Sequence, residues 1–271
     1  MLNQKDIIEY LKKIPPLPKS IEECLQYLQK EDLINAAKTI QNDKNLTSYL
    51  IEIVNKPYFG FKSEIRNINQ ILTILGVKNA KQILYGYLLS LIAPKSWKVF
   101  NLTNKDFYDL QSKIINDWNK ILLYENRDEE NLKTAINFIL LAILTAEEIF
   151  KDHFEDISVI KQVKEINYDE LLLKFTNMSL LDIAALISKK WKANETIILI
   201  LKDLSKKDAS NKNYGKFIKY LHLLLFYELS QPKFIKAGLN DFMEFDPSFV
   251  EDIFENFMKI VGTIKIYETC N

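Results

Sequence analysis

The sequence predicts an all-α protein, a multi-helix bundle with a C-terminal helical extension. Two observations lead to this prediction. Only six glycines occur among 271 residues. Apolar residues recur at steps of three and four along most of the chain, which is the spacing of amphipathic helices that pack on one another. No segment makes a convincing strand.

Several helix starts can be placed from capping residues, whose side-chain oxygens accept hydrogen bonds from free helical amides. A hydroxyl lies three residues ahead of a carboxylate in three pairs: Ser20 with Glu23, Thr103 with Asp106, and Ser179 with Asp182. Another start is expected at Asp246, which precedes Pro247 at the first helical position. Each start opens a segment with helical spacing.

Helix ends are marked by glycine and proline. Gly76 follows the apolar run 68–75, and Pro94 ends the run that begins near Ala80. About a dozen helices are expected from these marks. The polar stretch 205–213 is the weakest join, and it could separate the main bundle from the C-terminal extension.

Composition narrows the class of protein. The 36 basic and 36 acidic residues cancel, so the chain lacks the basic footprint of a nucleic-acid-binding protein. Cys24 and Cys270 stand alone and suit a reducing compartment. The N-terminal residues do not resemble a secretory signal, and the apolar stretches 83–94 and 135–146 are too short to cross a bilayer. We therefore expect a cytoplasmic protein with no membrane insertion and no nucleic-acid partner.

Four segments occur in an order that is characteristic of one family. They are a proline-rich opening at 14–18, an Asp-x-x-Leu turn at 43–46, an Asn-Lys-Pro-Tyr-Phe-Gly loop at 55–60, and a helix at 68–76 that ends in Leu-Gly. Together they resemble the HDOD domain. The pattern departs from the family at Lys44, Lys56 and Ile71.

The second half resembles the family more faintly. Residues 138–145 lie where the family carries Phe-x-x-Gly-Leu-Leu-His-Asp, which places Leu144 and Thr145 at the His-Asp doublet. Trp191 aligns with a family tryptophan and is expected in the core, because it ends the apolar helix 180–190. Leu204–Ser205 lies where a His-His pair often ends the domain.

The resemblance implies a division of the chain. Residues 1–205 would form the HDOD-like domain, with an N-terminal helical half at 1–100 and a degenerate HD-like half at 101–205. Residues 206–271 would form the C-terminal helical extension. The family is a divergent relative of metal-dependent HD phosphohydrolases and serves in bacterial signalling as an output or adaptor module.

The residues themselves argue against catalysis. An HD hydrolase needs imidazoles and carboxylates that converge on one or two metal ions. This chain contains only His153 and His222 and no His-Asp dipeptide. We expect His153 at a solvated helix terminus and His222 in a packed apolar helix. Because phosphate-binding glycine loops and a nucleophile elbow are absent as well, we expect no enzyme activity, no metal and no cofactor.

The loop after Asn55 is the candidate interaction loop. Asn55 can close a helix, Pro57 prevents its continuation, and Gly60 permits an unusual backbone angle, while Tyr58 and Phe59 supply large contact areas. Two interpretations remain open. The loop either locks two helices together or presents an aromatic side chain to a partner.

Two functions follow from these observations. The first is a non-catalytic signalling or regulatory module that acts through protein–protein contacts in a bacterial signal-transduction or motility-related pathway. The alternative is a sensor that binds a small anion or nucleotide in the degenerate HD-type pocket, although the sequence gives a nucleotide ligand no direct support. A pocket lined by lysines or arginines beside Leu144 would favour the sensor, and an apolar, filled core would favour the first function.

Overall fold

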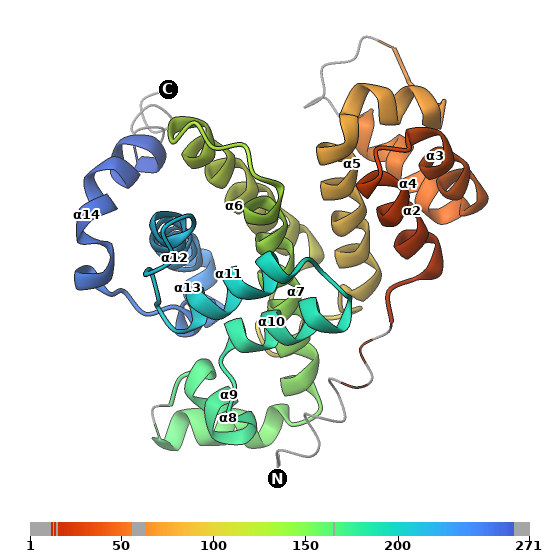
Figure 1. The fold of residues 1–271 in the computed structure, drawn as a ribbon. Helices are drawn as coiled ribbons and strands as arrows, with labels where there is room; N and C mark the ends of the chain where they lie inside the picture. The colour runs from red at the N-terminus through yellow and green to blue at the C-terminus, as the bar shows by residue number, and fades with distance from the viewer. Residues whose placement is uncertain (1–11, 13, 15, 56–62, 165, 263–271) are drawn as a thin grey trace. The chain divides into compact units, whose positions relative to one another are not determined.

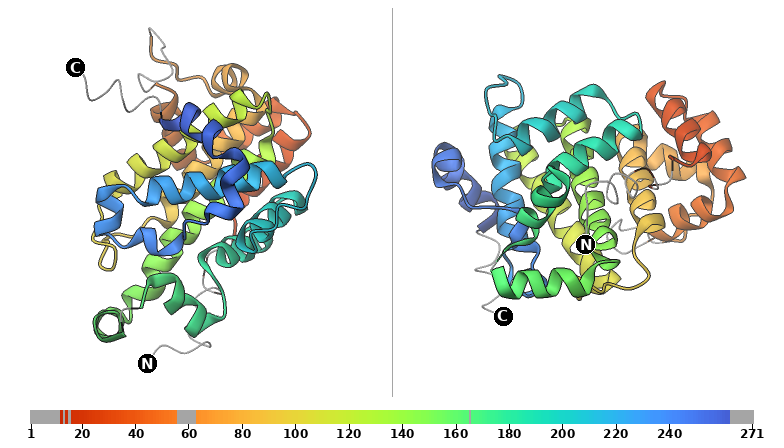
Figure 2. Two further views of the ribbon diagram at one scale, coloured as in Figure 1. Left: turned by 90° about the vertical axis from the view of Figure 1, so that its left-hand side faces the viewer. Right: turned by 90° about the horizontal axis from the view of Figure 1, so that it is seen from below.

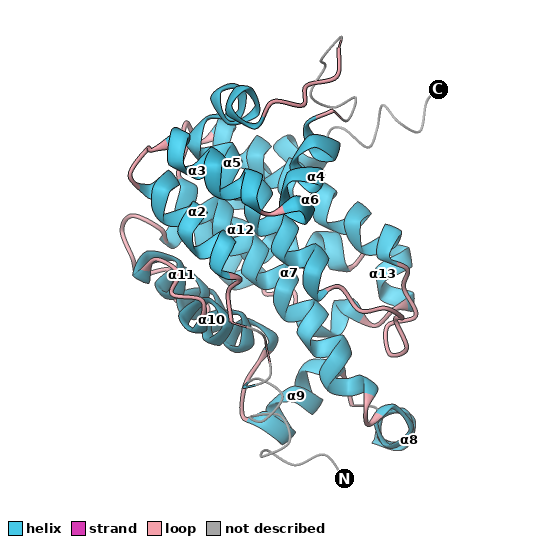
Figure 3. Cartoon of the chain, turned by 90° about the vertical axis from the view of Figure 1, so that its right-hand side faces the viewer, coloured by secondary structure: helices cyan, strands magenta, loops and turns pink. Residues whose placement is uncertain are grey.

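The computed structural model describes residues 12, 14, 16–55, 63–164 and 166–262. All regular elements in these ranges are helical, as the sequence predicts, and Figure 3 shows helices joined by loops. The chain forms two compact units, one from Pro15 to Ile92 and the other from Met1 to Ile14 together with Ala93 to Asn271. Each unit is described by itself below.

Among its described residues, the smaller unit has four helical elements that pack on one another. They are α2 (Lys19–Gln29), α3 (Leu33–Asn42), α4 (Lys44–Val54) and α5 (Ile68–Ile92). Gly76 interrupts α5 with a positive φ of 67°. The sequence predicts a helix end at this residue, and the helical segment resumes after Gly76 and ends at Ile92, before Pro94. Glycine suits this backbone conformation because it lacks a Cβ atom.

The caps of the smaller unit include one correction. Asp43 caps α4 by accepting hydrogen bonds from the backbone amides of Asn45 and Leu46. Ser20, however, does not cap α2, because the helix begins at Lys19 after the N-cap residue Pro18, which places Ser20 inside the first turn. The Ser20 hydroxyl instead donates to the Asp43 carboxylate at 2.8 Å. A contact between two helices therefore takes the place of the expected local one.

The larger unit contains the other helices that the structure describes. They are α6 (Asn104–Tyr124), α7 (Glu130–Lys151), α8 (Phe154–Lys164), α9 (Tyr168–Thr176), α10 (Leu180–Lys190), α11 (Glu195–Ser205), α12 (Gly215–Leu229), α13 (Pro232–Lys236), the 3₁₀ turn η2 (Leu239–Phe242), α14 (Pro247–Phe257) and the π-helical turn η3 (Met258–Gly262). The capping boxes at Thr103 and Ser179 and the cap at Asp246 are all present as predicted.

Helix α7 forms the centre of the larger unit. It packs against α6 on one side and against α10 and α11 on another, so it is buried nearly all round between Leu132 and Phe150. Helix α12 packs on α6 and α11, and α14 lies across α12, as Figure 2 shows in its left view. The C-terminal helices α12–α14 thus belong to the same compact unit as α6–α11.

The length and apolar character of the helices bear on whether they could cross a membrane. Among the described residues, no single helix is long and apolar enough to cross a bilayer, and the bent pair α9 and α10 meets the criterion of length and composition only when the two are taken together.

Candidate functional site

Leu144 and Thr145, the residues that sequence analysis expects at the family's His-Asp doublet, lie on α7 and are buried. Leu144 has no exposed surface and Thr145 is 2% exposed. The Thr145 hydroxyl donates to the backbone carbonyl of Leu141 at 2.9 Å, one helical turn earlier. This bond satisfies a buried polar group within its own helix. Packing and a local hydrogen bond therefore account for the environment of both residues.

These residues do not fit a metal ion. A leucine side chain has no donor atom, and neutral hydroxyls are poor ligands for the transition metals of HD hydrolases. Within the described ranges, no three His, Cys, Asp or Glu side chains gather closely enough to hold a metal ion. His222 lies on α12, where its Nε2 is 3.0 Å from the Glu244 carbonyl, and burial lowers its pKa. His153 is half-buried at the end of α7.

One turn after the doublet, Glu147 is completely buried. Its carboxylate accepts hydrogen bonds from three successive backbone amides of the segment that precedes α6: Lys98 at 2.6 Å, Val99 at 2.9 Å and Phe100 at 2.9 Å. Burial raises the pKa of Glu147, and the three amides act in the opposite direction. The arrangement fixes the chain entry into α6 and keeps this carboxylate away from solvent.

The end of the family's domain contains a second polar group that sequence analysis missed. Ser205, at the position of the family's His-His pair, donates to the Asp182 carboxylate at 2.7 Å and lies 3.2 Å from the Ser179 hydroxyl. The preceding residue, Leu204, is buried. The cap of α10 is thereby tied to the end of α11, so these residues hold two helices together.

Asp169 lies close to this group on α9. Its carboxylate accepts a hydrogen bond from the Leu180 amide at 3.1 Å. Burial, followed by the negative charges of Asp182 and Glu170, raises the pKa of Asp169 to about 6. A partly buried carboxylate beside like charges holds its proton more tightly. The raised pKa follows from packing of α9 against the cap of α10.

Asn55, the first residue of the candidate interaction loop, forms hydrogen bonds with backbone groups on both sides of the loop. Its side-chain amide donates to the carbonyls of Ile51 at 2.7 Å and Ile65 at 2.9 Å. Its side-chain oxygen accepts from the Ile65 amide at 2.8 Å. Asn55 therefore fixes the two ends of the segment between α4 and α5. The other members of the predicted loop, Pro57, Tyr58, Phe59 and Gly60, lie outside the described residues.

Trp191 lies in the core, as expected. It follows α10 directly, is 6% exposed, and has its ring centroid 6.2 Å from that of Phe138 on α7. The tryptophan therefore fills space between α10 and the central helix.

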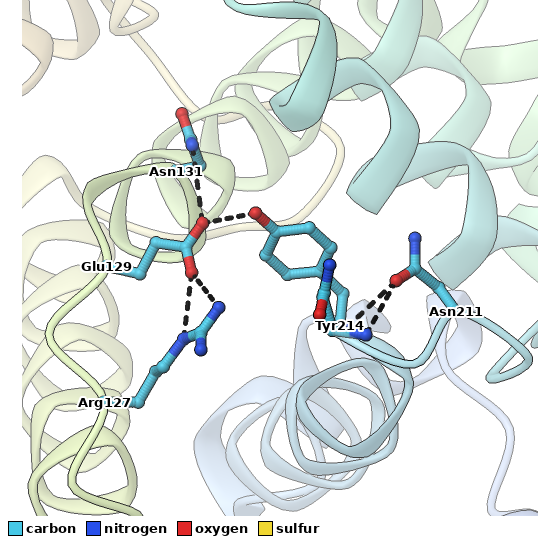
Figure 4. A network of polar contacts seen from close by, with 6 residues as sticks. Arg127, Glu129, Asn131, Asn211 and Tyr214 are labelled. Carbon is cyan, nitrogen blue, oxygen red and sulfur yellow. Dashed lines mark hydrogen bonds and ion pairs between the residues drawn. The ribbon is translucent and has the colours of Figure 1, made fainter.

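A polar network anchors the C-terminal extension to the segment between α6 and α7 (Figure 4). The Glu129 carboxylate accepts hydrogen bonds from Arg127 Nε at 2.9 Å and from the hydroxyl of Tyr214, which lies just before α12. The Asn211 side chain in turn accepts a bond from the Tyr214 backbone amide at 3.3 Å. Sequence patterns gave no signal for this network, because its members come from two segments far apart in the chain.

A second group of polar contacts joins the extension to α8 and α9. Asp241 accepts hydrogen bonds from Lys161 Nζ at 2.6 Å and from the Tyr168 amide at 2.9 Å. The Lys161 ammonium also lies 3.3 Å from the centroid of the Tyr168 ring. Gly238 makes this approach possible, since a Cβ atom there would lie 2.6 Å from the Tyr168 ring. The extension is therefore bound to the rest of its unit by charged contacts, which also include the ion pairs Lys216–Glu125 and Lys233–Asp106.

Comparisons with known proteins agree with this architecture. The family model for the HDOD domain matches residues 14–203, more than half of the chain. The chain therefore belongs to the HDOD domain family. No curated protein matches the sequence.

Solved structures show the same fold. The chain superposes on a protein of Shewanella amazonensis SB2B called a "Putative phosphohydrolase", with a TM-score of 0.65 and 15% identity over 96% of this chain and 89% of that one. It also superposes on an HDOD domain protein of unknown function from Geobacter sulfurreducens, with a TM-score of 0.58 and 12% identity over 97% of each chain. At these identities the similarity concerns the fold.

Proposed function

We propose that the chain is a non-catalytic regulatory module that acts through protein–protein contacts. One observation supports this proposal above the others. At the place expected for the metal-binding doublet, Leu144 and Thr145 are buried, and the Thr145 hydroxyl is bonded within its own helix. The nearest carboxylate along α7, Glu147, is buried and accepts hydrogen bonds from three backbone amides. The side chains at this position thus have a packing role.

The pathway in the proposal comes from the family. HDOD domains resemble HD phosphohydrolases and serve in bacterial signalling, so we place this chain in a cytoplasmic signal-transduction or motility-related pathway. Family analogy supplies that context, whereas the argument for binding comes from the site.

The sensor alternative has less support. A small anion or nucleotide in the degenerate pocket would need space and cationic side chains beside Leu144, which is fully buried. The smaller unit has an open depression of about 410 Å³, lined by Lys19, Ser20, Glu23, Thr39, Asn42, Asp43 and Lys44. Two of its lining residues are carboxylates, one of which accepts the Ser20 bond. This mixture of charges does not favour an anion.

The proposal is tested by measuring metal content, turnover and partner capture with the full-length protein. We expect less than stoichiometric iron, manganese or zinc by elemental analysis, and no hydrolysis of phosphate esters or cyclic nucleotides when these metals are added. We also expect a protein to be captured reproducibly from the native cytoplasm. Metal-dependent turnover, or one equivalent of metal bound by α7, would overturn the proposal.

The predicted loop offers a variant for the capture experiment. We expect the double change Tyr58→Ala and Phe59→Ala to lower partner capture more than tenfold, because an aromatic anchor at the centre of an interface often contributes at least about 2 kcal/mol. The melting temperature should change less. If both single variants melt at much lower temperatures and those that remain folded still bind the partner, the loop serves only to lock the helices.

A further inference from the structure

The C-terminal extension brings three phenylalanines side by side, and two of them are exposed. Phe226 on α12 and Phe245 stack with ring centroids 5.0 Å apart and planes 27° apart. Phe245 also contacts Phe254 on α14, with centroids 6.4 Å apart. Phe245 and Phe254 are each 40% exposed, and Phe226 is half-buried. We name these three residues the aromatic patch.

The patch lies beside the buried face of α14, not on it. Val250, Ile253 and Phe257 form the buried stripe of this helix. Phe254 lies at the edge of that stripe, and Met258, one turn later, is 41% exposed. Exposed apolar residues are common when they occur singly, whereas contiguous ones mark binding surfaces. Because the patch is small, it suits one or two anchoring side chains of a peptide segment and not the broad face of a domain.

Three exposed carboxylates lie close in the chain to members of the aromatic patch. The Glu244 side chain, next to Phe245, is 86% exposed and lies 3.7 Å from Lys207, which is closer to Asp246 at 3.0 Å. Glu251 and Glu255 flank Phe254 along α14 and are exposed. We name Glu244, Glu251 and Glu255 the acidic rim. The patch therefore combines apolar contact area with negative charge.

Glu251 and Glu255 of the acidic rim differ from Asp252, which lies between them on α14, in their ion pairing. Asp252 is paired with Lys219 on α12 at 2.8 Å, so its charge helps to hold α14 in place. Neither Glu251 nor Glu255 forms an ion pair with any residue that the structure describes. Their charges are therefore directed to solvent, where a cationic ligand can reach them.

We propose that the aromatic patch and acidic rim bind a basic, apolar peptide segment of a partner protein. Lysine or arginine side chains of that segment would pair with the rim and lie over the phenylalanine rings, while its apolar side chains would contact the patch. The rim repels anionic surfaces, so nucleic acid and acidic lipid are disfavoured. This inference rests on the proposed function, because it names the binding surface of the proposed interaction module.

A labelled synthetic peptide can test the surface directly. The probe is an amphipathic peptide of about 14 residues with a leucine and tryptophan face and a lysine face, roughly four helical turns in length. A matched probe carries glutamate at every lysine position. We expect the full-length protein to bind the lysine probe in a fluorescence anisotropy titration and to bind the glutamate probe at least tenfold more weakly.

Two variants of the surface and one control locate the binding site. Phe254→Ala removes part of the patch, and the double change Glu251→Lys and Glu255→Lys reverses the rim at exposed positions where folding does not depend on it. Each should weaken the lysine probe at least tenfold. Leu123→Ala is the control, since Leu123 is 78% exposed on α6 and lies outside the patch. Equal binding by all four proteins would overturn the proposal.

Other occupants give different results. Vesicles of phosphatidylglycerol should not bind, and vesicle binding that Phe254→Ala abolishes would assign the patch to lipid and overturn the proposal. Concentration-dependent dimers in sedimentation that are lost in Phe254→Ala would assign it to a second copy of the chain and do the same. If the wild type and Phe254→Ala capture the same cellular protein equally, the docking site is wrong while the interaction function stands. If the protein proves to be an enzyme, the function fails whatever the probe shows.

Discussion

Helix α7 buries a carboxylate, whereas helix α14 exposes a phenylalanine. Glu147 has no contact with solvent, and three backbone amides compensate for the loss of water. Phe254 remains 40% exposed, although Ile253 and Phe257 on the same helix are buried. A buried polar group with complete partners indicates a structural role, whereas clustered exposed apolar groups leave surface available to another molecule. The comparison therefore assigns a structural role to Glu147 on α7, and it agrees with the binding surface that we propose on α14.

The largest effect is expected at Trp191, which packs near Phe138 of α7. Trp191→Ala should lower the free energy of unfolding by about 3–5 kcal/mol, because it leaves a cavity in a core that cannot fully collapse. Urea denaturation monitored by circular dichroism measures this change. A stability equal to that of the wild type, together with lost partner binding, would move the binding surface from α14 towards the core helices.

A somewhat smaller effect is expected at Glu147. Glu147→Leu leaves three backbone amides without their acceptor, and each unsatisfied buried donor costs about 1–3 kcal/mol before relaxation or water entry reduces the sum. We expect a loss of about 3 kcal/mol in the same urea experiment. The control is Glu148→Leu, because Glu148 is partly exposed and pairs with Lys151 at 3.2 Å. Its loss should stay below about 1 kcal/mol, and equal losses would remove the structural role from Glu147.

The pH dependence of Asp169 gives a third effect, of about 1–3 kcal/mol. Its pKa rises from the ordinary 3.8 to about 6 in the folded chain, so the folded chain binds this proton more tightly than the unfolded chain. Stability from this group is therefore present at low pH and lost as the pH rises from about 4 to 6. Asp169→Asn keeps an acceptor for the Leu180 amide and removes the charge. Its stability relative to the wild type should increase across this window.

The pKa of Asp106 is shifted in the opposite direction, so the stability of an Asp106 variant should change with pH in the opposite sense. Its hydrogen bond with Lys233, followed by that with the Thr103 amide, lowers its pKa, so its contribution is present above the ordinary pKa and lost as the pH falls. Asp106→Asn should therefore lose stability relative to the wild type as the pH rises through 4. If both variants show the same trend, burial does not control the ionisation of Asp169.

Much of the fold follows from local sequence signals. The capping boxes at Thr103 and Ser179 and the break at Gly76 each depend on residues within one or two turns, so spacing alone located them. The expectation that Ser20 caps a helix was wrong. Its hydroxyl donates instead to Asp43, a residue 23 positions away. A local sequence pattern does not show that a distant carboxylate will accept the hydrogen bond of the hydroxyl.

The candidate site depends on long-range contacts, and these set the limit of sequence analysis. Leu144 and Thr145 could be placed at the doublet because the family pattern is continuous along the chain. The role of Glu147 could not be predicted, since its amide partners lie 47–49 residues earlier. An acid that directly follows a long apolar run was the available signal. The aromatic patch was equally hidden, because it forms only when α12, Phe245 and α14 come together.

The smallest effect on stability is expected at Phe254, and it bears directly on the comparison between α7 and α14. Phe254→Ala should change the free energy of unfolding by less than about 1 kcal/mol, because the ring is already partly hydrated and its loss leaves a surface depression that water fills. Phe257→Ala is the matched control on the same helix, since that ring is fully buried between α14 and the rest of the unit. It should cost about 3–5 kcal/mol. Urea denaturation of both variants gives the ratio. If Phe254→Ala costs as much as Phe257→Ala, the exposed phenylalanine is needed to hold α14 on α12, and the surface of α14 then has the same structural role as the buried face of α7.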